Sequence, residues 1–317
     1  MIISESDAKW AADEFIHYFK NFTSIEDYLR HVKKEVVCKT NQLSPLQDEF
    51  FNEDIHPNEM EFDIKFIGNR FNHSLPQEHY KNLLAAVSSH NNESNIPGRE
   101  LRWMIFEKKS QKIVGFIRFG SPTINSKPRN IWLGKQPNLS VFNRHAAMGF
   151  VIVPSQPFGY NYLGGKLLAL MCVSHFARET LNKVFEKDIA LFETTSLYGS
   201  TTSASQYDGL KPFIRYKGLT ESNKLQEFNS VINMAFGLTQ RKRFYISDYG
   251  YGNVREVINE QHEKLIPGQN WDKFYLENII TWWKRKASKR YEKLKQENRF
   301  RDKVELWTED DNIQIIR

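Results

Sequence analysis

Cysteine is scarce in this sequence, whose 317 residues contain only Cys38 and Cys172. This scarcity excludes a disulfide framework and a cysteine-based zinc site, and it is typical of a reducing compartment. No stretch of about 18 apolar residues is present, so we expect no membrane span. The N-terminal sequence becomes charged at once and lacks the basic and apolar regions of a signal peptide. We therefore expect a cytoplasmic protein without a membrane partner.

Familiar catalytic signatures are absent as well. The sequence has no Walker loop, no His-Glu-x-x-His motif and no Gly-x-Ser-x-Gly motif. Its nine histidines are scattered. The closest pair, His73 and His79, has a spacing that does not place both side chains on one face of a helix. We therefore predict no metal site.

The composition indicates a folded chain, because 40% of the residues are hydrophobic and 14% are aromatic. Two strand-like runs, at 101–106 and 113–119, are separated by a polar piece, which predicts an antiparallel hairpin. An apolar run at 149–154, a long run of helix formers at 165–184 and an apolar run at 189–192 predict a strand, a helix and a second strand parallel to the first. The sequence therefore predicts an α/β fold with a mixed sheet and flanking helices.

The segments around this core are less regular. We expect helices on both sides of an irregular stretch at 41–72, and a short strand or turn at 131–134. A turn-rich linker at 91–98 marks a boundary. The predicted regions are a helical N-terminal region at 1–95, the core at 96–240 and a basic helical C-terminal region at 241–317.

A glycine-bearing turn follows the predicted strand that ends at Pro154. Glycines let the backbone approach a ligand closely and a helix N-terminus favours an anion, so the junction predicts a pyrophosphate site. The candidate cofactor-binding residues are Val153, Gly159, Asn161, Gly164 and Gly165. The alternative is that the glycines only supply a turn and permit close packing of strand against helix.

A hydroxyl-rich segment begins at Glu193, directly beyond a predicted strand. A transferase that acts on an exocyclic amine needs one group to accept the amine proton and another to protonate the leaving group. We predict that Glu193 is the base, that Tyr198 or Tyr207 is the acid, and that Ser196 orients the substrate. The alternative is that these hydroxyls cap a helix and bond the backbone of turns.

The positive charge is concentrated near the C-terminus. Residues 280–303 contain ten basic and three acidic side chains, so this segment carries +7 and the rest of the chain −1. Lys and Arg side chains bind phosphates irrespective of sequence, and interleaved aromatic residues can stack on bases. We predict contact with nucleic acid, preferably DNA, by Lys284, Arg285, Lys286, Lys289, Arg290 and Lys293. An apolar stripe that includes Trp283, Ala287 and Leu294 would pack the same helix on the core. An acidic protein partner is the alternative, and a membrane surface the least favoured one.

The order of a hairpin, a strand that closes on Val153-Pro154, a glycine turn and a Leu-rich helix resembles the core of GNAT acyltransferases. Over about residues 113–222 the chain is also similar to two divergent GNAT-like groups, the Mom-type DNA modification proteins of phages and the DruA-type subunit of the Druantia antiphage system. The matching positions are Val114-Gly115-Phe116, Phe119-Gly120-Ser121-Pro122, Asn138-Leu139, Asn143, Gly149–Pro154, Asn161, Leu167-Leu168, Glu193-Thr194, Tyr207 and Gly218-Leu219-Thr220.

The resemblance implies a GNAT-like mixed sheet whose turn cradles the pyrophosphate of an acyl-CoA or related CoA-type donor. It also implies an active site at Glu193, Thr194 and Tyr207. We therefore expect a phage or mobile-element transferase that modifies a nucleobase by acyl-type transfer while bound to nucleic acid. The alternatives are a non-catalytic nucleic-acid-binding antiphage or anti-restriction component, and a structural interaction protein with a basic docking helix. The oligomeric state is open.

Overall fold

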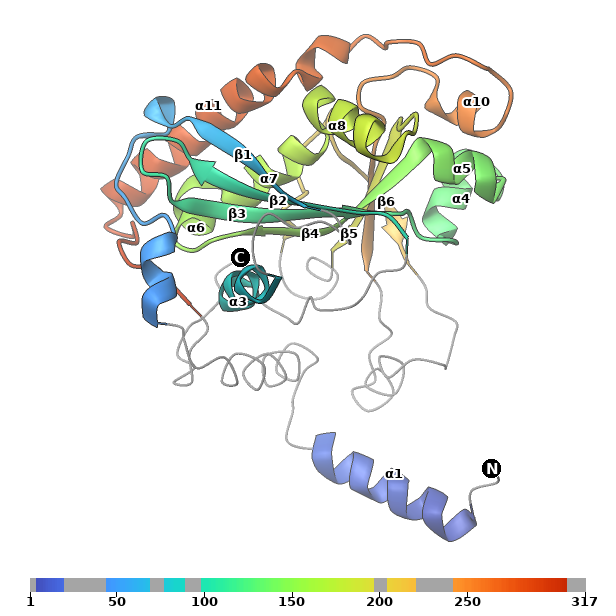
Figure 1. Cartoon of the computed structure of the whole chain (residues 1–317), viewed down its shortest axis with the longest axis horizontal. Helices are drawn as coiled ribbons and strands as arrows, with labels where there is room; N and C mark the ends of the chain where they lie inside the picture. The colour runs from blue at the N-terminus through green and yellow to red at the C-terminus, as the bar shows by residue number, and fades with distance from the viewer. Residues whose placement is uncertain are drawn as a thin grey trace.

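The computed structural model describes residues 4–19, 44–68, 77–88, 98–196, 204–220 and 242–306, and all structural statements below concern these ranges. They form a mixed α/β fold around one sheet (Figure 1). No helix in these ranges combines the length and the apolar character needed to cross a bilayer. The first helix, α1, spans Glu5–Phe19, within the region expected to be helical.

The sheet has seven strands in the order β1-β2-β3-β4-β5-β7-β6. Only β4 and β5 are parallel, and all other neighbours are antiparallel. The strands are β1 (Phe62–Gly68), β2 (Glu100–Glu107), β3 (Ile113–Gly120), β4 (Ala146–Pro154), β5 (Leu191–Ser196), β6 (Arg215–Leu219) and β7 (Arg243–Ser247). The predicted hairpin and the predicted parallel pair are both confirmed. The sheet takes β1 from the region expected to be N-terminal and β7 from the region expected to be C-terminal.

Three helices connect the parallel strands, where the sequence predicts one. They are α6 (Phe158–Tyr162), α7 (Gly164–Cys172) and α8 (His175–Phe185). The break after α7 has a local cause, because the Ser174 hydroxyl accepts a hydrogen bond from the Ala177 amide at 3.1 Å and so caps a new helix. The prediction of one continuous helix at 165–184 is therefore wrong, because two helices cover this range.

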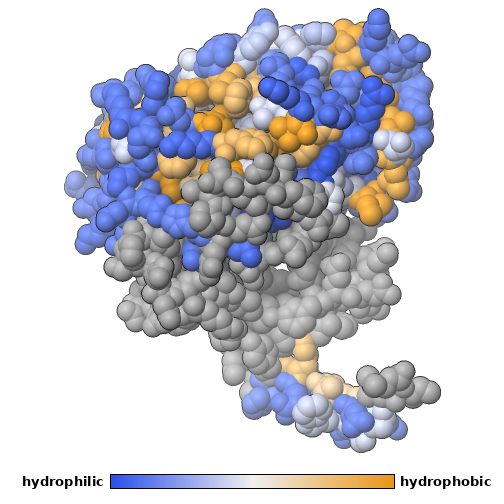
Figure 2. All heavy atoms as spheres, viewed as in Figure 1, coloured by the Kyte–Doolittle hydropathy of each residue, from blue (hydrophilic) through white to orange (hydrophobic). Residues whose placement is uncertain are grey.

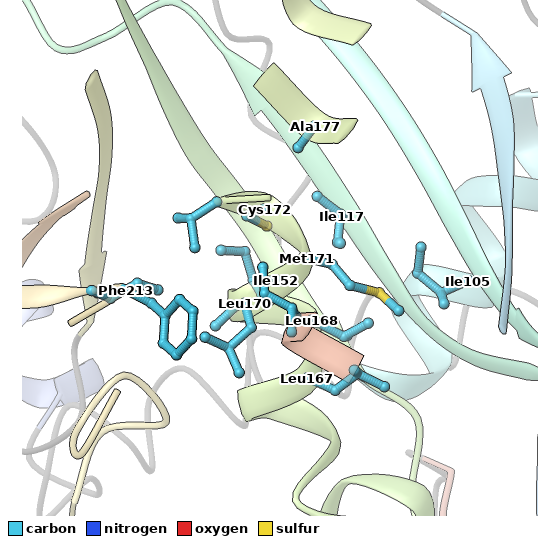
Figure 3. Close-up of a cluster of buried hydrophobic side chains, with 14 of the residues drawn as sticks. Ile105, Ile117, Ile152, Leu167, Leu168, Leu170, Met171, Cys172, Ala177 and Phe213 are labelled. Carbon is cyan, nitrogen blue, oxygen red and sulfur yellow. The ribbon is translucent and has the colours of Figure 1, made fainter. Parts of the chain in front are cut away.

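The largest core lies between one face of the sheet and helices α7, α8 and α11, the last of which spans Leu276–Gln296. Figure 3 shows the centre of this core, where apolar side chains of α7 meet Ile105, Ile117 and Ile152 from neighbouring strands. Gly115 lets α7 approach the sheet, because a Cβ there would lie 2.4 Å from a methyl group of Leu168. Burial of these side chains is the main stabilising contribution to this layer.

The opposite face of the sheet is covered in two parts. Helix α3 (Gln77–Val87) packs on β2, β3 and β4, and lies below the sheet in Figure 1. Helices α4 (Lys127–Leu133), α5 (Leu139–His145) and α10 (Val254–Ile258) enclose a third apolar cluster with β4, β5 and β7. The short strand or turn predicted at 131–134 is wrong, because most of this stretch belongs to α4.

Helix α11 lies across the end of α6 and α7 and is fixed there by its predicted apolar stripe. Trp283, Ala287 and Leu294 are fully buried. The Trp283 indole donates to the carbonyl oxygen of Tyr162 at 2.9 Å. Short 3-10 helices at Ser44–Glu49, Pro57–Glu59 and Trp271–Phe274 complete the described elements. The face shown in Figure 2 is mostly hydrophilic, with apolar patches between hydrophilic residues, which is ordinary for a folded chain.

Candidate functional site

A buried ion pair joins β5 to α4. Glu193 and Arg129 are both fully buried, and Nη1 of Arg129 lies 3.4 Å from each carboxylate oxygen of Glu193. The two residues are 64 positions apart in the sequence, so the fold alone brings them together. The sequence pointed to Glu193 and not to Arg129.

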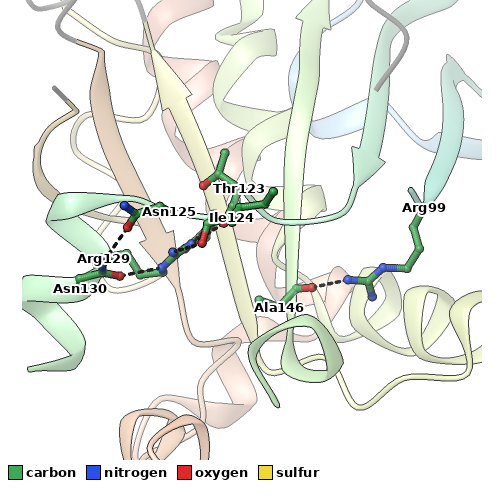
Figure 4. Close-up of polar contacts among 8 residues, drawn as sticks. Arg99, Thr123, Ile124, Asn125, Arg129, Asn130 and Ala146 are labelled. Carbon is green, nitrogen blue, oxygen red and sulfur yellow. Dashed lines mark hydrogen bonds and ion pairs between the residues drawn. The ribbon is translucent and has the colours of Figure 1, made fainter. Parts of the chain in front are cut away.

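Arg129 is held in place by groups other than the carboxylate. Nη1 donates to the carbonyl oxygen of Thr123 at 2.7 Å and Nη2 donates to that of Ile124 at 3.1 Å (Figure 4). Nε lies 3.4 Å from Oδ1 of Asn130, and the guanidinium stacks 4.2 Å from the Phe142 ring centroid. The guanidinium therefore keeps its position whether or not Glu193 is ionised.

Burial has the largest effect on the pKa of Glu193. Loss of hydration raises the pKa of this carboxyl to about 7, and the nearby Arg129 guanidinium opposes the rise without cancelling it. A carboxyl group with a pKa near 7 can both accept and release a proton at neutral pH. A base that accepts the proton of an exocyclic amine needs this ability to take up a proton.

A second polar group lies on the other side of the same strand. The Thr194 hydroxyl donates to the carbonyl oxygen of Gly149 at 3.0 Å and lies 3.3 Å from the Tyr207 hydroxyl. Tyr207 is buried, and the loss of hydration raises its pKa to about 12. The Tyr207 amide donates to the hydroxyl of Ser205 at 3.3 Å. Tyr207 is thus a weaker acid than an exposed tyrosine.

The structure does not bring the predicted base and acid together. Glu193 and Thr194 are consecutive in a strand, so their side chains point to opposite faces of the sheet. Glu193 faces Arg129, whereas Thr194 faces Tyr207. Ser196 is buried at the end of β5. Tyr198 lies outside the described residues.

The two parallel strands separate beyond this point. Their pairing covers only four residues of each strand and ends where Gly149 faces Thr194. Farther along β4, the carbonyl oxygen of Ile152 accepts a hydrogen bond from the side-chain amide of Gln206 at 3.0 Å. The segment that contains Gln206 and Tyr207 therefore fills the gap between β4 and β5.

Three backbone amides of the predicted pyrophosphate turn donate hydrogen bonds within the chain. The Gly159 amide donates to the carbonyl oxygen of Ser155 at 2.8 Å, and the Asn161 amide donates to that of Pro157 at 2.9 Å. The Tyr160 amide donates to the side chain of Gln156 at 3.0 Å. In this conformation these three groups have no hydrogen left for a phosphate oxygen.

The glycines of this turn are closely packed by protein atoms. A Cβ at Gly164 would lie 2.5 Å from the Phe158 ring, and one at Gly165 would lie 2.3 Å from Oε1 of Gln206. The side-chain amide of Asn161 bonds the backbone of Arg301 in both directions, at 2.7 and 3.1 Å. These contacts favour the packing alternative, and acyl-CoA binding by Asn161 and the glycines stays a prediction. Val153, also predicted to bind the cofactor, pairs with Phe116 within the sheet.

The six predicted nucleic-acid contacts on α11 divide into two groups. Lys284 donates to the carbonyl oxygen of Asn58 at 2.9 Å, and Arg290 donates to that of Tyr160 at 3.2 Å while stacking on the Tyr160 ring. These two cations hold the helix against the protein. The other four are exposed and form what we term the outward face of α11, namely Arg285, Lys286, Lys289 and Lys293.

Comparison with protein families identifies the family of this chain. The family model described as Druantia protein DruA matches residues 19–271, which is most of the chain. Neither a curated protein nor a solved structure matches. The match includes α4 and β5, which carry the buried ion pair, and ends before α11.

Proposed function

The chain belongs to the Druantia protein DruA family, which indicates a role in antiphage defence, and from this premise we propose that it acts there by binding nucleic acid, preferably DNA, through the outward face of α11. The observation that carries the proposal is the division of the cations on this helix. Lys284 and Arg290, which fix α11, are bonded to the protein, whereas the four cations of the outward face are exposed to solvent. Of these four, Lys293 also pairs with Glu297, at 3.6 Å and in solvent.

The spacing of the four outward cations supports contact with a phosphate backbone. From Arg285 to Lys293 the helix rises about 12 Å, at about 1.5 Å per residue. This length corresponds to three or four phosphates along one strand, which follow each other at about 3.4 Å along the axis of B-DNA. Because α11 is anchored by buried Trp283, the cations are presented on a rigid element.

The test is a DNA titration at several salt concentrations, read by fluorescence anisotropy of a labelled 20-base-pair duplex. The variant carries R285Q, K286Q, K289Q and K293Q. With about 0.9 counterions released per duplex phosphate contact, we expect the slope of log affinity against log salt to become shallower by about 3 to 4. The matched control removes four exposed lysines elsewhere, K81Q, K183Q, K187Q and K264Q. An unchanged slope, or an equal loss in the control, would contradict the role of α11.

We propose a second candidate function, a GNAT-like transferase that modifies a nucleobase with an acyl-CoA or related donor. The specific observation in its favour is the complete burial of the Glu193 carboxyl beside Arg129. This burial raises the pKa of the carboxyl to about 7, which suits proton acceptance from an exocyclic amine. The single parallel strand pair and its separation beyond Gly149 agree with the resemblance to the GNAT core. Since Glu193 is fully buried and the amides of Gly159, Tyr160 and Asn161 are bonded within the chain, this function requires a change of conformation when substrates bind.

Two measurements test the transferase. Mass spectrometry of nucleosides from cells that express the protein should reveal a modified base, and the modification should disappear with E193Q at an equal protein level. Acetyl-CoA at millimolar concentration should raise the melting temperature if the Pro154–Gly165 turn binds the donor. Absence of any modified nucleoside would reject catalysis and leave the binding function in place.

A further inference from the structure

An open groove runs along the outer side of helix α4. In Figure 1 this helix lies at the right end of the sheet, just below α5. Its volume is about 460 Å³. The lining contains two lysines, three side-chain amides and one exposed isoleucine, and no acidic residue. The lining residues are Asn125, Lys127, Asn130, Ile131, Gly134, Lys135 and Gln136.

A cluster of cations around Trp132 continues this groove toward β6 and α10. The charged groups of Lys217 and Arg255 lie 5.6 and 6.0 Å from the centre of the Trp132 ring. Arg255 also borders the groove, because a Cβ at Gly134 would lie 3.8 Å from its Nη2. Lys135 donates to the last turn of α10 at the carbonyl oxygen of Asn259. The groove and the cluster therefore form one surface.

Positive charge in the cluster exceeds negative charge. The pKa of Lys217 is lowered from its ordinary value by partial burial and then by the nearby Arg215, while Arg255 and Lys211 add to this effect. Asp248 acts in the opposite direction, but it is already paired with Arg215. An anion bound beside Lys217 would relieve this repulsion.

We infer that the α4 groove and the cation cluster bind single-stranded nucleic acid, with Lys127, Lys135, Lys217 and Arg255 contacting its phosphates. A single strand fits this site better than a duplex, because its bases are unpaired and can enter a groove. The side-chain amide of Gln136 can then bond a base edge, since an amide offers both donors and an acceptor. Asn125 can donate to a base from its amide N–H groups, while its Oδ1 accepts from the Asn130 side chain at 2.9 Å. The exposed Ile131 can cover the apolar face of a base.

This surface is distinct from the outward face of α11. Helix α4 packs on the side of the sheet that holds the third apolar cluster, and α11 packs on the opposite side. The inference therefore does not depend on the function proposed for α11, and the two can fail separately.

The experiment compares binding of labelled oligo(dT) of about 20 nucleotides and of the 20-base-pair duplex, using the full chain and two double variants. K127Q/K135Q removes the groove lysines, and K217Q/R255Q removes the cations around Trp132. The matched control, K183Q/K187Q, removes two exposed lysines of the α8 region. Circular dichroism verifies that each variant is folded.

Each double variant should weaken oligo(dT) binding about tenfold and make the salt slope shallower by about 1.4, because a single strand releases about 0.7 counterions per phosphate contact. Duplex binding and the control should stay within twofold of the unmodified chain. The inference is overturned if the unmodified chain does not bind oligo(dT), if the groove variants bind it like the control, or if single strand and duplex are weakened equally. Loss of duplex binding only in the α11 variant would support the function proposed for α11 and leave this result unchanged.

Discussion

Replacing Glu193 with glutamine should change how the stability of the protein depends on pH. The pKa of this carboxyl rises from its ordinary 4.5 to about 7 in the folded chain because the group is buried. Between these values the folded state keeps the proton while the unfolded state has released it. The unfolded state therefore binds fewer protons, and the free energy of unfolding must fall as pH rises through this window.

The magnitude follows from the size of the pKa change. At 1.36 kcal/mol per pH unit, the move from 4.5 to about 7 corresponds to about 3 kcal/mol, lost gradually between pH 4.5 and 7 and fully lost above pH 8. Arg129 does not reverse the sign, because its contacts with the carboxylate are 3.4 Å long. Charge-assisted hydrogen bonds are usually about 2.7 to 2.9 Å. Nη1 makes its shorter bond, 2.7 Å, to Thr123.

The assay is urea unfolding at pH 5, 6, 7 and 8 for the unmodified chain and for E193Q. Near pH 5 the two should differ by less than about 1 kcal/mol, because Glu193 is still neutral in the folded chain and is only partly ionised in the unfolded chain. At pH 8, E193Q should be more stable by about 3 kcal/mol. The exposed Glu263 provides the control, and E263Q should follow the unmodified chain. If the ion pair instead held Glu193 ionised, E193Q would be the less stable protein at pH 8 by about 3–5 kcal/mol, and the reasoning would be refuted.

Substitutions at two further positions, Trp283 of α11 and Gly115 of β3, test the packing of the largest core. W283A should lower the free energy of unfolding by about 3–5 kcal/mol, since it empties a fully buried site. W283F should lower it by about 1–3 kcal/mol, because the carbonyl oxygen of Tyr162 loses its donor. Equal effects of the two variants in urea unfolding would exclude the hydrogen bond as a contributor. G115A should cost about 1–3 kcal/mol, because the new Cβ would lie 2.7 Å from the backbone oxygen of Val153. G252A is the control, since its nearest atom lies at 3.5 Å, and a G115A protein as stable as G252A would contradict the close approach.

The parts of the fold that the sequence predicted well are those with a strong local signal. The β2–β3 hairpin and the β4–β5 pair are apolar runs bounded by polar turns, so period and length identify them. Strand β1 was missed inside the stretch expected to be irregular. Its sequence, Phe62-Asp-Ile-Lys-Phe-Ile, alternates apolar and polar residues as an edge strand does, and this signal could have identified it.

The candidate site was less predictable because its two paired residues, Glu193 and Arg129, are far apart in the sequence. Glu193 was found from its place at a strand, but no local pattern distinguishes Arg129 from a surface arginine. The glycines of the turn were ambiguous for another reason. A glycine permits close approach of a ligand or of a protein side chain equally well, and only the tertiary neighbours decide. Here those neighbours are Phe158 at Gly164 and Gln206 at Gly165.

Helix α4 contributes residues to both the buried ion pair and the groove, one on its inner side and the other on its outer side. It has only seven residues, which is too short to be stable alone. Arg129 fixes its inner side by donating to the carbonyl oxygens of Thr123 and Ile124. Lys127 and Ile131 face the groove from its outer side. The shape of the groove should therefore depend on a residue that no ligand can touch.

R129M tests this dependence, at pH 6 so that Glu193 is mostly neutral and leaves no unpaired buried charge. The methionine fills much of the volume of the arginine but leaves the carbonyl groups of Thr123 and Ile124 without a donor. We therefore expect α4 to shift from its position against the sheet. We expect oligo(dT) binding to weaken about tenfold, as with K127Q/K135Q, while circular dichroism shows a folded protein. L133A is the control, because it removes buried apolar contacts from the same helix and keeps the arginine. If R129M bound oligo(dT) as tightly as L133A, the groove would not depend on the buried guanidinium, and α4 would be held by its apolar contacts instead.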